Sequence, residues 1–135
     1  MTAAEGQKIY DAAVNEGSWS YTEGRKPGEP KKNFCANVGD CTDFVEASMR
    51  GAGMPELNPR PATEGYPGTS YRLVTSPQVG DVIVQAGHAG IYKGQNSRGQ
   101  PTALQNGVHG TKVVPFGKGS SFSGTESYYR RLIPQ

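Results

Sequence analysis

The chain has 135 residues and a formal net charge of +2, with 14 Lys and Arg against 12 Asp and Glu. This length suits one domain, and we expect residues 1–135 to form it. The charges are spread along the sequence, which argues against nucleic acid as a partner. Two cysteines are too few for a disulfide scaffold. The 19 Gly and 10 Pro predict a loop-rich domain with short regular elements.

Membrane insertion is not expected, because the sequence has no run of about 18 apolar residues. The first residues carry Glu5, Lys8, Asp11 and Glu16 and contain no apolar signal core. We therefore expect that this chain has no export signal of its own.

The amino-terminal part predicts a helix over residues 2–16. Thr2 and Glu5 have the spacing of a capping box, and apolar residues from Ile9 onward recur at helical spacing. Residues 18–39 are rich in Gly, Pro, Lys and Asn, and this composition is typical of a loop.

A second helix is predicted over residues 41–52, because apolar residues again follow a helical stripe and Gly51 and Gly53 stand at its end. Cys41 would then open a helix that faces the core. Residues 54–80 hold five of the ten prolines and predict an extended surface loop.

After Gly80 the hydrophobic pattern changes to that of strands separated by Gly-rich turns. A helical front half followed by strands predicts an α+β fold with an antiparallel sheet of about five strands. The predicted strands are 81–85, 88–93, 102–106, 111–116 and 126–133.

Cys41 is the candidate nucleophile. A thiol reacts as the thiolate, and the amino terminus of a helix lowers its pKa through unpaired N–H groups and the helix dipole. Such a nucleophile also needs a base that accepts its proton and delivers it to the leaving amine. The chain has two histidines. His88 begins a predicted strand, and we expect the neighbouring Gly87 and Gly90 to leave open space around its imidazole. His109 stands in a turn, so His88 is the candidate base.

A third polar group is expected to accept from the other ring nitrogen of His88 and so fix its tautomer. The next predicted strand offers Gln105 and Asn106. Neighbouring residues of a strand point to opposite faces, so only one of the two can face His88. We prefer Asn106, although the intervening loop hides the register.

Two stretches resemble the NlpC-type cell-wall peptidases and the related CHAP amidases. "DCTDFVEASMRGAGMP" is similar to the helix of this family that carries the nucleophile. "VGDVIVQAGHAGIYKG" resembles its histidine hairpin, and "SYYRRLI" resembles its closing strand. The resemblance spans roughly residues 17–133. It implies a papain-like fold in which the Cys41 helix packs on a twisted antiparallel sheet.

The resemblance also implies roles for other residues. Tyr21, in "GSWSYTEG", matches the family tyrosine that lies beside the nucleophile and helps to bind or polarise substrate. The NlpC branch often has a histidine near the position of Gln105, whereas CHAP domains have an asparagine that falls at Asn106. Asp43 stands where glycine is common, and its carboxylate would oppose thiolate formation if it faced the sulfur.

By this likeness the expected function is hydrolysis of an amide bond in the peptidoglycan stem peptide. The bond from the D-glutamate side chain to the diamino acid is favoured, and an N-acetylmuramoyl-L-alanine amidase would use the same groups. A chain of this kind resembles antibacterial type VI secretion effectors delivered to the periplasm of a target cell. Expected partners are therefore peptidoglycan, a cognate immunity protein and a carrier of the secretion apparatus.

Several alternatives stay open. A papain-like toxin that deamidates or cross-links glutamine side chains of proteins would also use Cys41 and His88. A catalytically inactive fold could bind wall peptides without cleaving them. Cys35 is expected to be structural or incidental, with a disulfide to Cys41 as the alternative. No cofactor is expected, and the cysteines and histidines lack the spacing of a zinc site.

Overall fold

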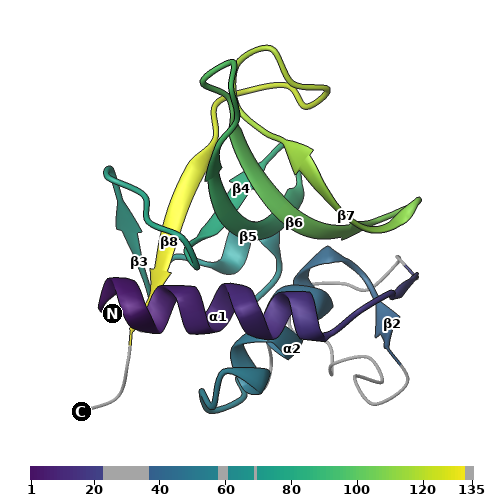
Figure 1. Ribbon diagram of the computed structural model, residues 1–135, viewed down its shortest axis with the longest axis vertical. Coiled ribbons are helices and arrows are strands. Elements are labelled where there is room, and N and C mark those ends of the chain that lie inside the picture. The colour runs from purple at the N-terminus through teal and green to yellow at the C-terminus, as the bar shows by residue number, and fades with distance from the viewer. Residues whose placement is uncertain (23–36, 58–60, 69, 133–135) are drawn as a thin grey trace.

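The computed structural model describes residues 1–22, 37–57, 61–68 and 70–132 (Figure 1). Cys35 and the middle of the predicted 18–39 loop lie outside these residues. The described chain contains two α-helices and a six-stranded sheet in which every pairing is antiparallel. The predicted α+β class is therefore confirmed. No helix in the described ranges is both long enough and apolar enough to span a bilayer.

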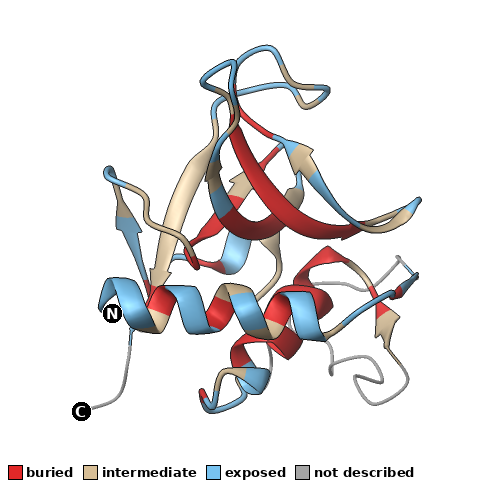
Figure 2. Cartoon of the chain, viewed as in Figure 1, coloured by how far each residue is buried: buried red, intermediate tan, exposed pale blue. Residues whose placement is uncertain are grey.

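Helix α1 (Ala3–Asn15) begins at the predicted capping box. The Thr2 hydroxyl accepts from the Glu5 backbone N–H at 3.1 Å, and the Glu5 carboxylate accepts from the Thr2 N–H at 2.7 Å. Ile9 and Ala13 are fully buried, so one face of α1 packs on the core and the opposite face is exposed (Figure 2). These contacts hold α1 against α2 and the central strands.

Helix α2 (Cys41–Gly51) is buried from Cys41 to Met49 and packs against both α1 and the sheet. Its Glu46 carboxylate accepts a hydrogen bond from the Tyr71 hydroxyl and faces Arg131, with 3.5 Å between the charged atoms. A buried carboxylate needs such partners. This network therefore connects α2 to Tyr71 and Arg131, which are paired on two adjacent strands of the sheet.

The strand order in the sheet is β3-β8-β4-β5-β6-β7, so the last strand lies between β3 and β4. The bounds are β3 (Tyr71–Val74), β4 (Val82–Gln85), β5 (His88–Gln95), β6 (Pro101–Gly107), β7 (Gly110–Pro115) and β8 (Ser127–Arg131). Strands β4 to β8 correspond to the five predicted strands.

Three short strands fall in segments that were predicted to be loops. The prediction of a continuous surface loop over 54–80 is wrong for β3, which pairs with β8, and for the 3-10 turn η2 (Thr63–Gly65). Pro67 and Pro77 flank β3 and leave its ladder intact. Within the predicted 18–39 loop, β1 (Ser20–Tyr21) and β2 (Val38–Gly39) form a parallel pair beside the start of α2.

The two faces of the sheet bury different apolar clusters. The first, here called the helix-side cluster, contains Cys41, Ala89, Ile91 and Leu104 together with the buried residues of α1 and α2. The second, here called the far-side cluster, contains Ile83, Ala103 and Phe116. Adjacent strand residues point to opposite faces, and both sides of β5 and β6 are covered in this way (Figure 2).

Candidate active site

The amino terminus of α2 places Cys41 at the first helical position. Asp40 is the N-cap residue, and its carboxylate accepts from the Asp43 N–H at 2.9 Å. The Asp43 carboxylate accepts in return from the Asp40 N–H at 2.9 Å. This reciprocal pair is a capping box, which satisfies N–H groups that the helix cannot satisfy itself. Asp43 is thus committed to the helix cap, where it favours the start of α2 at Cys41.

The Cys41 thiol is buried, with 5% of the residue exposed. Burial raises its pKa to about 11, and the Asp40 carboxylate adds to this effect. The backbone N–H groups of Ala89, Thr42 and Cys41 face the sulfur and act in the opposite direction. At neutral pH the resting side chain is consequently a thiol, and the shift of its pKa is opposite to the lowering expected from the helix amino terminus.

His88 is held at the beginning of β5 by a tight hairpin. The two turn residues, Ala86 and Gly87, both have positive φ angles, of 53° and 77°, as a two-residue turn with the twist of a β-hairpin requires. The imidazole stacks on Phe122 and Phe116, with centroids 5.2 and 5.8 Å away. Burial lowers the pKa of His88, although the hydrogen bond that the ring donates to Gln105 raises it. The imidazole is therefore neutral at pH 7.

Gln105 is the residue that orients His88. Its Oε1 lies 2.6 Å from His88 Nε2, while its own Nε2 donates to the Lys112 carbonyl at 3.1 Å. The second bond fixes which end of the amide faces the ring. Because Oε1 can only accept, the neutral imidazole carries its proton on Nε2. Nδ1 is left with a lone pair and is the basic atom of the ring.

Asn106 points to the other face of β6. Its Nδ2 donates to the Gly39 carbonyl at 2.9 Å, and the residue is fully buried. The preference for Asn106 as the partner of His88 is thus wrong, because the alternation along β6 gives that face to Gln105. The expectation that only one of the two can face the imidazole is confirmed. Asn106 instead ties β6 to the segment that leads into Cys41.

Gly90 permits this contact. It follows His88 on the same face of β5, and a Cβ there would lie 3.1 Å from the Gln105 Cβ and 3.0 Å from the Ala103 Cβ. The sequence suggested that Gly87 and Gly90 leave open space around the imidazole. This is correct for Gly87, which has no atom within 4 Å of such a Cβ, but wrong for Gly90. Its missing side chain allows β6 to approach.

Cys41 and His88 approach the start of β5 from its two faces. The sulfur faces the N–H of Ala89, the residue after His88, and belongs to the helix-side cluster. The His88 ring contacts Phe116 of the far-side cluster. No hydrogen bond joins the sulfur to the imidazole among the described residues, and the β5–β6 ladder begins only at Ile91.

A pocket of about 330 Å³ adjoins the imidazole. The described residues that line it include Tyr21, His88 and Gln105 but not Cys41. The structure thus places Tyr21 in one pocket with His88, whereas the resemblance implied a place beside the nucleophile, and the sulfur remains beneath the surface. His109 is exposed in the β6–β7 turn, as expected.

Sequence reasoning missed that His109 and Lys112 line this same pocket, together with Phe122. Lys112 is directly opposite Gln105 in the β6–β7 ladder, and so the two side chains share a face. The short turn "NGVHGT" was the signal that could have paired these positions. Phe122 comes from the segment between β7 and β8, and no local pattern indicates its position.

In comparison with known proteins, no protein-family model matches the chain and no curated protein matches it. Within the described ranges, no three His, Cys, Asp or Glu side chains gather closely enough to hold a metal ion.

Proposed function

We propose that the chain is a papain-like cysteine hydrolase that cleaves an amide bond in the peptidoglycan stem peptide, with Cys41 as the nucleophile and His88 as the base. One observation carries the proposal. The Gln105 amide holds the His88 imidazole with Nδ1 as its basic atom, and the residue after His88 turns its N–H toward the sulfur. A base oriented by a third group and a thiol at a helix start are the components of a Cys–His hydrolase.

In this mechanism the sulfur attacks the substrate carbonyl carbon while its proton passes to His88 Nδ1. The Cys41 backbone N–H and the Tyr21 hydroxyl stabilise the oxyanion. His88 then donates the proton to the leaving amine as the carbon–nitrogen bond breaks, which leaves a thioester on Cys41. Water attacks the thioester, Nδ1 accepts the water's proton, and Cys41 leaves as the thiol after receiving that proton.

Because its pKa is raised, the Cys41 thiol keeps its proton until substrate is bound. A thiol with a pKa near 11 is not ionised at neutral pH, so the sulfur must lose its proton in the presence of substrate. His88 is suited to accept it, since burial keeps the imidazole neutral. The proposal is therefore general-base catalysis at Cys41 and does not need a preformed ion pair.

The bond that we propose joins the side-chain carboxyl of D-glutamate to the diamino acid. Cleavage between muramic acid and L-alanine by the same groups is the alternative. If the enzyme is delivered into the periplasm of a target cell by a type VI secretion carrier, the producer requires an immunity protein that covers the pocket of Tyr21 and His88.

A second candidate, a fold that binds wall peptides without cleaving them, is favoured by the burial of Cys41. With 5% of the residue exposed and no place in the pocket lining, the sulfur requires local movement before it reaches a carbonyl carbon. A binding protein would bind stem peptides equally well after Cys41→Ala, and it would release no product.

The test uses the tripeptide L-Ala-γ-D-Glu-diamino acid, with products separated by chromatography and weighed by mass spectrometry. The hydrolase predicts free diamino acid from the wild type and none from Cys41→Ala. Binding without cleavage would support the second candidate. Release of ammonia from a glutamine-containing protein, with the tripeptide intact, would instead identify a deamidase.

A further inference from the structure

We propose that Lys112 recognises a carboxylate of the substrate next to the bond that is cleaved, which makes the pocket selective for the free α-carboxylate of D-glutamate. This inference rests on the proposed function, because it assigns a substrate group to the same pocket. It adds a specificity residue on β7 and predicts which chemical form of the stem peptide is used.

Lys112 is placed for this role by the register of the sheet. It is paired with Gln105 across the β6–β7 ladder, and directly opposite side chains of an antiparallel pair have Cβ atoms about 5 Å apart. Gln105 Oε1 in turn lies 2.6 Å from the His88 ring. The Lys112 side chain is therefore adjacent to that of Gln105, which orients the base. It is exposed, and its ammonium group can reach the mouth of the pocket.

The charge of the pocket has one sign. Lys112 is the one lysine or arginine among the described residues that line it, and none of these residues is an Asp or Glu. Aromatic and apolar side chains, including Phe122, Val114 and Pro115, form much of the remaining wall. Such a wall lowers the local dielectric, so that a cation beside it attracts an anion more strongly than it would in water.

The substrate offers a matching group. In the bond from the D-glutamate side chain to the diamino acid, the α-carboxylate belongs to the same glutamate residue as the reacting carbonyl. The corresponding carboxamide has nearly the same shape but no charge. A carboxylate hydrogen-bonded to an ammonium gains a charge-assisted bond that the amide cannot replace. The muramic acid to L-alanine bond has no free carboxylate on its acyl residue or on the L-alanine.

The experiment compares two tripeptides that differ only at this group, with α-carboxylate or α-carboxamide on D-glutamate. We expect wild type to show a kcat/KM about tenfold or more higher for the carboxylate form at low salt, and less preference at high salt. Lys112→Met should reduce the ratio to about 1 while cleavage of the carboxamide form is retained. Lys93→Met, a change at an exposed lysine on β5 outside the pocket, should keep the wild-type ratio.

Binding of both peptides to Cys41→Ala by calorimetry separates this inference from the proposed function. If wild type cleaves neither peptide but Cys41→Ala still binds the carboxylate form more tightly through Lys112, the hydrolase fails and the recognition site stands. Equal affinities for the two peptides, no binding of either, or a preference unchanged by Lys112→Met would each overturn the inference.

Discussion

Burial keeps both proposed catalytic side chains uncharged. The Cys41 pKa is raised to about 11 and the His88 pKa is lowered, each mainly because the charged form loses hydration. Neither side chain provides a permanent charge in the resting protein. Alkylation of Cys41 at different pH values should therefore report the ionisation of the resting thiol. The pH dependence of kcat/KM should report the groups that act when substrate is present.

The first prediction concerns alkylation of Cys41 in the Cys35→Ser variant. At pH 7 iodoacetamide should react about four orders of magnitude more slowly than with the fully ionised thiol, because the pKa is about 11. The rate should rise about tenfold for each pH unit until that pKa is approached. Mass spectrometry follows the labelled peptide, and Cys41→Ala should give no label there. A rate that levels off below pH 9 would show that the sulfur ionises readily at rest.

The second prediction concerns the pH dependence of kcat/KM. The pKa of His88 is lowered from its ordinary value of 6.5, so Nδ1 stays unprotonated at pH 6.5. The acidic limb of the profile should therefore lie below pH 6.5. Gln105→Glu should place a carboxylate against the ring, raise the His88 pKa and move this limb to higher pH. Gln105→Ala should reduce kcat without that upward movement. Identical profiles for wild type and Gln105→Glu would show that Gln105 does not act on the His88 imidazole.

The role of Gln105 illustrates what local sequence patterns leave open. They indicated Cys41 and His88 as candidates, and a pair of neighbours of which one must face the imidazole. The choice between Gln105 and Asn106 depends on the β5–β6 register, which shifts between Tyr92 and Gly94. An irregularity inside a ladder leaves no period in the sequence, so the correct partner appears only once the strands are paired.

At the scale of elements, both helices could be predicted from caps and apolar spacing. Thr2 and Glu5 fixed the start of α1, and Asp40 with Asp43 caps α2. Strand β3 could not be predicted, because it is a short edge strand whose partner, β8, comes near the end of the chain. Prolines on both sides of such a strand are compatible with a loop or an edge, and only the distant partner decides between them.

The third prediction tests the packing of α1. A Cβ at Gly6 would lie 2.1 Å from the Val79 carbonyl oxygen, and this backbone atom cannot move aside without shifting the β3–β4 connection. Gly6→Ala should lower the free energy of unfolding by about 1–3 kcal/mol through overpacking, although alanine favours helix. Urea unfolding measures the change. Gly65→Ala, where no atom lies within 4 Å, is the control and should change it by less than about 0.5 kcal/mol. Equal stabilities for the two variants would contradict this packing.

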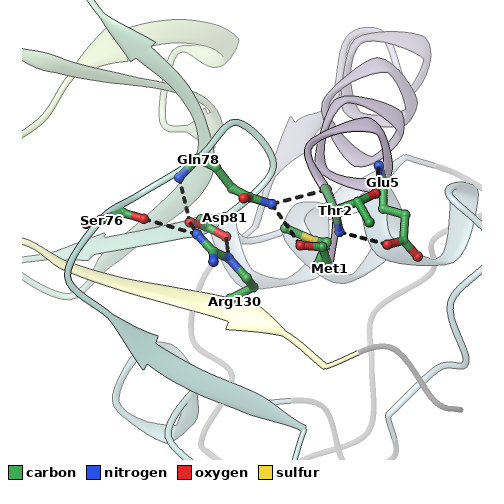
Figure 3. Close-up of polar contacts among 7 residues, drawn as sticks. All are labelled: Met1, Thr2, Glu5, Ser76, Gln78, Asp81 and Arg130. Atoms are coloured by element: carbon green, nitrogen blue, oxygen red, sulfur yellow. Dashed lines mark hydrogen bonds and ion pairs between the residues drawn. The ribbon is translucent and has the colours of Figure 1, made fainter.

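At the scale of the whole molecule, a polar network joins α1 to the sheet (Figure 3). Arg130 on β8 donates to both carboxylate oxygens of Asp81 at 2.9 Å. Asp81 also accepts from the Gln78 N–H at 2.8 Å, and the Gln78 side-chain amide donates to the Thr2 carbonyl at 3.2 Å. The first turn of α1, the β3–β4 connection and β8 are thus connected through one buried carboxylate.

The fourth prediction is that loss of this carboxylate destabilises the fold. Asp81 is fully buried, and Asp81→Ala should cost about 3–5 kcal/mol because the Arg130 guanidinium loses its anion. Thermal and urea unfolding report the loss. Glu56→Ala, which removes a partly exposed ion pair to Arg50, is the comparison and should cost less than about 1 kcal/mol. Similar costs for both variants would show that the network contributes little.

The strand order is the part of the fold that the sequence left open. The pattern of strands after Gly80 predicted the class and five of the six strands of the sheet. It could not predict that β8 lies between β3 and β4, because that placement is decided by pairing over long sequence distances. The pocket depends on the same long-range packing, since Tyr21, the β6–β7 hairpin and Phe122 come from separate parts of the chain.

The most direct test of the central claim is the mass of muropeptides released from purified sacculi by wild type and by Cys41→Ala. If Cys41 and His88 form a peptidoglycan hydrolase, wild type should release fragments ending at D-glutamate, while Cys41→Ala and His88→Ala, both folded by circular dichroism, should release none. Sacculi left unchanged by the folded wild type, or equal release by the Cys41→Ala variant, would contradict the account.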